Sequence, residues 1–112
     1  MARCAPCKAE QPDLVAEWKD YKAKKAGVAY LDIVVEDNAH MTAGEQLVKD
    51  WATQYMLPFD VAADPNKVMS PYFDLNTFPN QLVIKLDDMT IAAFSVGVKP
   101  GVLTGAIDEA LK

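Results

Sequence analysis

The sequence has no long hydrophobic run. Its longest wholly apolar stretches are four residues, for example residues 91–94. A helix that crosses a bilayer needs about 20 consecutive apolar residues, so the sequence predicts no membrane span. The amino-terminal residues also contain no apolar stretch of signal-peptide length. The cellular compartment therefore has to be argued from other features.

Basic residues are scarce relative to acidic ones. Eleven Lys and Arg residues face sixteen Asp and Glu residues, the formal net charge is -5, and the lysines are scattered along the chain. Such a chain offers no surface that would neutralise phosphates, and it predicts no nucleic-acid partner. The 112 residues are 51% hydrophobic, which is the composition and size of one globular domain spanning residues 1–112.

Metal-binding side chains are few. His40 is the only histidine, and the only cysteines are the two in Cys4-Ala5-Pro6-Cys7. Two thiols at this spacing also form half of a structural zinc site, which is the alternative to redox chemistry. The other Cys or His ligands of such a site are absent, so the sequence predicts no metal centre. We expect His40 to be an ordinary loop residue.

The position of the two cysteines indicates reversible thiol chemistry. Apolar residues recur at helical spacing after them and predict a helix over residues 4–25. Free amides and the positive dipole at a helix start lower a thiol pKa below about 8.5. Cys4 is then the exposed nucleophile and Cys7, one turn later, the resolving thiol. A purely structural disulfide is the other interpretation, but so small a loop adds little stability.

The rest of the chain alternates between helical and extended patterns. Thr42-Ala43-Gly44-Glu45 fits a capping box that opens a second helix, and Pro100 opens a last one. We expect Trp18, Trp51, Tyr21 and Tyr55 to belong to the core. The other predicted elements are strands over residues 28–35, 59–63, 81–86 and 90–96 and a short helical segment over 67–72. This order describes an α/β sandwich.

Three segments resemble a known family. Residues 4–12 resemble the active-site helix of thioredoxins, especially of periplasmic relatives of the TlpA and ResA type, in which Lys8, Glu10 and Pro12 have counterparts. Residues 76–84 resemble the cis-proline loop of that family, with Pro79 as the cis-proline. Residues 42–63 resemble the helix and strand that TlpA-like proteins and peroxiredoxins insert into the basic fold.

The resemblance implies a fold and an activity. The fold is a thioredoxin-like three-layer sandwich, a mixed sheet flanked by helices. The activity is thiol-disulfide exchange with protein disulfide or dithiol substrates and an upstream electron donor. The redox-active disulfide Cys4–Cys7 serves without another cofactor, and the substrate site contains Ala5, Pro6, Phe78 and Pro79. Phe78 either floors the substrate groove or packs against the cysteine helix. The implied location is periplasmic or otherwise extracytoplasmic, with the cytoplasm as the alternative.

The sequence departs from the family in two places. Arg3 stands where the family usually has Trp. The central strand of the family precedes the cysteine helix, but only three residues precede Cys4, so we expect an amino-terminally truncated domain. It should have a slot between residues 28–35 and 81–86, which should not pair with each other.

These departures keep two other functions open. One is a redox-inactive thioredoxin-fold binding module or fragment. The other is a thiol peroxidase, which would need a threonine where Met1 stands. Asp32, which interrupts an apolar strand, is either a buried acid that tunes a cysteine or a solvated or hydrogen-bonded carboxylate.

Overall fold

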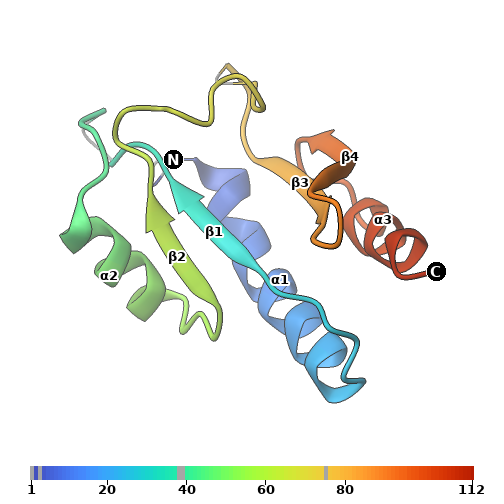
Figure 1. Ribbon diagram of the computed structural model, residues 1–112. Helices are drawn as coiled ribbons and strands as arrows, with labels where there is room; N and C mark the ends of the chain where they lie inside the picture. The colour runs from blue at the N-terminus through green and yellow to red at the C-terminus, as the bar shows by residue number, and fades with distance from the viewer. Residues whose placement is uncertain (1, 3, 38–39, 75) are drawn as a thin grey trace.

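The computed structural model describes residues 2, 4–37, 40–74 and 76–112 (Figure 1). The predictions that concern Met1 and Arg3 therefore lie outside the described residues. The elements follow in the order α1 (Ala5–Ala23), β1 (Leu31–Val34), α2 (Glu45–Gln54), β2 (Asp60–Ala63), β3 (Asn80–Lys85), β4 (Thr90–Val96) and α3 (Val102–Ala110). The α/β class predicted from the sequence is confirmed.

The strands form two separate ladders. β1 pairs in parallel with β2, and β3 pairs antiparallel with β4, with a register shift between Val83 and Ile84. Within the described residues, β1 and β3 are not hydrogen bonded to each other. The prediction that these two strands do not pair with each other is confirmed, and each has a backbone edge that the other does not hydrogen bond.

The best-buried apolar cluster lies between α2 and the β1–β2 ladder. Val34, Ala43 and Trp51 are each 5% exposed or less. Around them pack Leu47, Tyr55, Leu57, Val61 and Ala63. Trp51 and Tyr55 are ring neighbours, with centroids 4.8 Å apart. Of the four aromatic residues expected in the core, Trp51 and Tyr21 are buried, and Trp18 and Tyr55 are half-buried.

Aromatic side chains of α1, the helix that carries the cysteines, contact the rest of the chain. Figure 1 shows α1 passing behind β1, with α3 beside the β3–β4 ladder. The Trp18 ring lies 6.4 Å from Phe59, measured between centroids. The Tyr21 hydroxyl donates to Asp108 Oδ1 over 2.7 Å and lies 3.2 Å from the Thr104 carbonyl oxygen. These contacts join α1 to the segment just before β2 and to α3.

Two local predictions were wrong. The capping box does not form, because α2 begins at Glu45 with Gly44 as its N-cap and no side-chain cap bond. The helical segment over 67–72 is a series of turns. There the Asp64 carboxylate accepts the amides of Val68 and Met69, both over 2.9 Å, and Lys67 has a left-handed φ of 53°. A carboxylate that satisfies these amides replaces the hydrogen bonds that a helix would supply.

No helix in the described part of the chain combines the length and apolar character that a bilayer crossing requires.

Candidate active site

Cys4 is the N-cap of α1. Its backbone is extended, with φ of -77° and ψ of 108°, and its Sγ accepts a 3.2 Å hydrogen bond from the Cys7 amide. Pro6 lies in the first turn, where a missing amide costs no helical bond. The sulfur of Cys4 thus occupies the place at which a helix start stabilises negative charge. This geometry favours a thiolate at Cys4 in the reduced chain.

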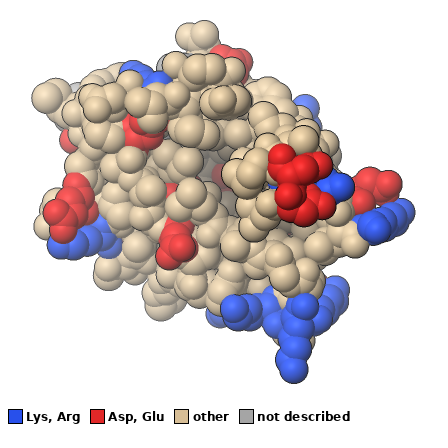
Figure 2. Space-filling model, viewed as in Figure 1, with Lys and Arg blue, Asp and Glu red and all other residues tan. Residues whose placement is uncertain are grey.

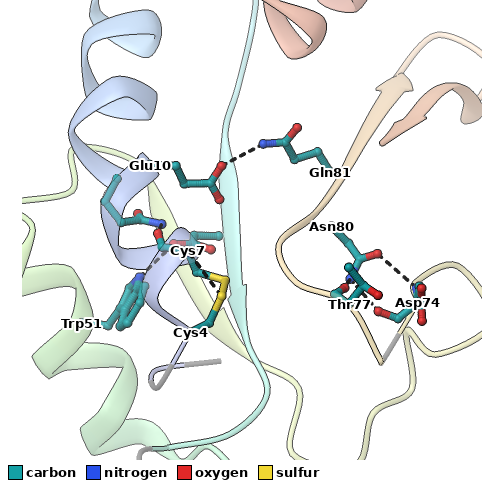
Figure 3. Close-up of a disulfide and its surroundings, with 10 residues drawn as sticks. Cys4, Cys7, Glu10, Trp51, Asp74, Thr77, Asn80 and Gln81 are labelled. Atoms are coloured by element: carbon teal, nitrogen blue, oxygen red, sulfur yellow. Dashed lines mark hydrogen bonds between the residues drawn. A yellow bond between two sulfur atoms is a disulfide. The ribbon is translucent and has the colours of Figure 1, made fainter. Parts of the chain in front are cut away.

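Cys4 and Cys7 are joined by a disulfide, with their Cα atoms 5.2 Å apart (Figure 3). Cys7 is buried, at 6% exposure, whereas Cys4 is half-buried. The intervening Ala5 and Pro6 are exposed. A partner can therefore approach the disulfide from the side of Cys4, across Ala5 and Pro6.

Glu10 is a candidate functional residue that the sequence reasoning did not single out. It lies three residues after Cys7 on α1, and residues at this spacing share a helix face. Its side chain is buried, and Oε2 accepts a 2.9 Å hydrogen bond from Gln81 Nε2. Burial, and then the negative charge of Asp32, raises the pKa of Glu10 to about 7. The available sequence signal was an acid at this spacing from the second cysteine.

Asp32 lies on β1 within electrostatic reach of Glu10. Its Oδ2 accepts a 2.9 Å hydrogen bond from Trp51 Nε1 on α2. Burial raises the pKa of Asp32, and the bond from Trp51 opposes that rise. Of the two interpretations of Asp32, the hydrogen-bonded one describes its contacts, and its charge acts on Glu10. Figure 3 shows Trp51 and Glu10 among the surroundings of the disulfide.

Gln11 completes the buried polar surroundings of Cys7. It is 2% exposed, and its Nε2 donates a 3.1 Å hydrogen bond to the carbonyl oxygen of Cys7. This bond spans one helical turn and restrains the backbone at Cys7. The turn from Cys7 to Gln11 is therefore restrained by the Gln11 side chain.

The proline loop, residues 74 and 76–79, carries the other predicted site residues, Phe78 and Pro79. Phe78 is half-buried, Pro79 is buried, and the peptide bond between them is cis. Asn80, the first residue of β3, donates to the carbonyl oxygens of Asp74 and Thr77 over 2.8 and 2.9 Å. In Figure 3 the labelled residues Asp74, Thr77 and Asn80 are drawn apart from the disulfide. The structure joins Cys4 to Cys7 directly and links the proline loop to the cysteine helix through β3.

A cleft of about 310 Å³ separates α1 from β3 and the segment before α3. Glu10 and Glu17 line it from α1 and Gln81 lines it from β3, while Lys99 and Leu103 line it from the segment before α3 and from α3. Figure 2 shows that this view of the molecule is hollowed at its centre. Among residues 2, 4–37, 40–74 and 76–112, no three His, Cys, Asp or Glu side chains are grouped so as to hold a metal ion.

Comparison with models of protein families gives a match over most of the chain. The model of the AhpC/TSA family matches residues 1–93. Members of this family are redox enzymes that act through thiols. No match was found among curated proteins or among solved structures.

Proposed function

Because this chain belongs to the AhpC/TSA family, we propose that it is a thiol-disulfide oxidoreductase whose redox group is the Cys4–Cys7 pair. The observation that carries this proposal is the disulfide at the N-cap of α1. Its Cys4 sulfur accepts a helix amide, while Cys7 is buried one turn later. The pair therefore consists of one accessible and one protected sulfur, as reversible exchange requires.

The reaction begins with the reduced chain. The Cys4 thiolate attacks one sulfur of a partner disulfide, the partner S–S bond breaks, and the departing partner thiolate takes up a proton. A mixed disulfide now links Cys4 to the partner.

The Cys7 thiol gives its proton to the Glu10 carboxylate and attacks the Cys4 sulfur. The Cys4–Cys7 disulfide forms, and the second partner thiolate leaves and takes a proton. Two electrons have passed from the dithiol to the partner.

Glu10 suits this proton transfer because its pKa is about 7. An acid with a pKa near the working pH is populated in both protonation states and can accept and return a proton within one cycle. An unperturbed glutamate, with a pKa near 4.5, would be a weak base toward a thiol. The chemistry is reversible, and the upstream donor, a dithiol, returns the chain to its reduced state.

The substrate site in this proposal is the surface around Cys4. Ala5 and Pro6 are exposed beside it, and the resemblance adds Phe78 and Pro79 as the loop that meets the substrate backbone. The substrates are protein disulfides or dithiols, and no further cofactor takes part. The extracytoplasmic location that the resemblance implies stays a prediction.

A turnover assay tests the proposal. The full chain is mixed with excess dithiothreitol and a fluorogenic peptide disulfide, and the rate of peptide reduction is compared with that of dithiothreitol alone. We expect rate acceleration by the unaltered chain, none by Cys4→Ser, and a smaller acceleration by Cys7→Ser, in which dithiothreitol has to resolve the mixed disulfide on Cys4 in place of Cys7. A Glu109→Gln variant, which changes an exposed acid on α3, should keep the full rate. If Cys4→Ser accelerates the reaction as well as the unaltered chain, the proposal is wrong.

A further inference from the structure

The first two residues of β3 hold two different parts of the molecule. Consecutive side chains of a strand project to opposite faces, so Asn80 and Gln81 point in opposite directions. Asn80 faces the proline loop, where its Nδ2 donates to the carbonyl oxygens of Asp74 and Thr77, and its Oδ1 accepts the Asp74 amide over 3.1 Å. One amide group thus closes the loop with three hydrogen bonds.

Gln81 reaches the cysteine helix. Its Nε2 donates 2.9 Å to Glu10 Oε2, across 71 residues of sequence and across the cleft between β3 and α1. Glu10 is 7% exposed and Gln81 is half-buried, so water competes only weakly for this bond. The adjacent residues Asn80 and Gln81 therefore connect the proline loop to the acid that lies one turn after Cys7.

We propose that Asn80 and Gln81 are positioning residues that tie the proline loop to Glu10, so that the position of the loop and the proton on Glu10 are coupled. This inference rests on the function proposed above, in which the loop meets substrate and Glu10 takes the proton of Cys7. We call this pair of residues the β3 clasp. It acts through Glu10 and the loop, and neither member touches a reacting sulfur.

The coupling follows from the charges that surround Glu10. Its own helix contributes Asp13 and Glu17, β1 contributes Asp32, and Lys99 lines the cleft from the segment before α3. The three acids and burial disfavour the carboxylate, whereas the bond from Gln81 favours it. A hydrogen bond to an ionised carboxylate is about twice as strong as one to a neutral acid. When Glu10 accepts a proton, its hold on Gln81 therefore weakens, and the restraint on β3 and its loop weakens with it.

The first test measures the pKa of Glu10 by NMR titration of its carboxyl carbon in the oxidised full chain, in which the cysteines do not titrate. Gln81→Leu removes the bond and should raise this pKa by about one pH unit, a tenfold change in proton affinity. Gln46→Leu makes the same change at an exposed amide on α2 and should leave the pKa of Glu10 unchanged. An unchanged pKa in Gln81→Leu would overturn the inference.

The second test measures exchange kinetics. Asn80→Asp replaces a donor to two carbonyl oxygens with a negative charge, and it should raise KM for a peptide disulfide about fivefold to tenfold. The rate at which iodoacetamide alkylates Cys4 should change less than twofold. Asn66→Asp, in an exposed turn, is the control and should change neither value. The double variant Asn80→Asp with Gln81→Leu should raise KM by less than the product of the two separate increases, because the two residues act together. Fully multiplicative losses would contradict the coupling.

If the variants do not fold, a measurement on the unaltered chain still tests the inference. The side-chain amide signals of Gln81 should shift with pH along the same titration curve as the Glu10 carboxyl, and those of Gln46 should not. Gln81 signals that ignore the Glu10 titration would overturn the inference. Both NMR titrations are independent of turnover, so a chain without exchange activity would refute the proposed function while they still decide the Gln81–Glu10 contact.

Discussion

The indole nitrogen of Trp51 donates a 2.9 Å hydrogen bond to Asp32 Oδ2, which joins α2 to β1. Trp51 is 5% exposed and belongs to the best-buried apolar cluster. The bond therefore anchors a carboxylate at the edge of that cluster, where its charge contributes to the raised pKa of Glu10. One core side chain thus fixes part of the electrostatic surroundings of the candidate site.

Trp51→Phe should destabilise the chain by roughly 2 kcal/mol, because it removes both the donor to Asp32 and part of a buried ring. Urea unfolding at neutral pH measures this loss. The penalty should shrink in acid, where a protonated Asp32 no longer accepts the bond as an anion. Trp18→Phe makes the same change at a half-buried ring next to Phe59 and should show no such pH dependence. Equal pH profiles for the two variants would refute this role for Asp32.

Glu10 should make the chain less stable as the pH rises. Near pH 4 the carboxyl is largely protonated in the folded chain and partly so in the unfolded one. Between about 4.5 and 7 the unfolded chain releases the proton and the folded chain keeps it. The free energy of unfolding therefore falls with pH, and the fall is complete above pH 7. Allowing for partial solvent screening, we expect a loss of roughly 2 kcal/mol.

The measurement that checks this is urea unfolding of Glu10→Gln and of the unaltered chain from pH 4 to 8. The variant stays neutral and can still accept the bond from Gln81. It should match the unaltered chain near pH 4 and exceed its stability at pH 8. Glu109→Gln, at an exposed acid, should follow the unaltered chain throughout. If Glu10→Gln is no more stable at pH 8 than the unaltered chain, folding does not raise the pKa of Glu10.

The sequence predicted those features that depend on local pattern. Hydrophobic spacing was sufficient to find α1, and β4 was predicted with the bounds Thr90–Val96 that the structure has. The pairing of Cys4 and Cys7 follows from their spacing at a helix start. That β1 and β3 do not pair was predicted from the resemblance, because residue pattern alone does not give strand order.

The features that were missed depend on contacts between distant segments. Glu10 looks like a solvated helix residue until β3 places Gln81 against it, 71 residues later. The turns after β2 depend on the Asp64 carboxylate, which competes with helix formation for the amides of Val68 and Met69. The hydrogen bond of Asp32 depends on α2, which places Trp51 beside it, and the interpretation of Asp32 as an acid that tunes a cysteine stays a prediction.

Tyr21→Phe should loosen α3 from the cysteine helix. The Tyr21 hydroxyl donates to Asp108 over 2.7 Å, and the pKa of Tyr21 is raised by burial and by that bond. Removing the hydroxyl should cost about 1 kcal/mol of unfolding free energy, measured by urea denaturation, and should increase amide hydrogen exchange in α3. Tyr55→Phe removes a hydroxyl whose partner is the exposed Gln54 and should cost much less. Equal costs would contradict this account of the α1–α3 contact.

The most direct test of the central claim is to trap the mixed disulfide. The reduced Cys7→Ser chain is incubated with a short peptide disulfide near neutral pH, and the intact mass and the modified residue are identified by mass spectrometry. The account predicts a peptide adduct on Cys4 that accumulates within minutes, while the reduced Cys4→Ser chain forms an adduct on buried Cys7 at least tenfold more slowly. Equal rates at the two cysteines, or no adduct on Cys4, would contradict the claim that Cys4 is the nucleophile of a thiol-disulfide exchange site.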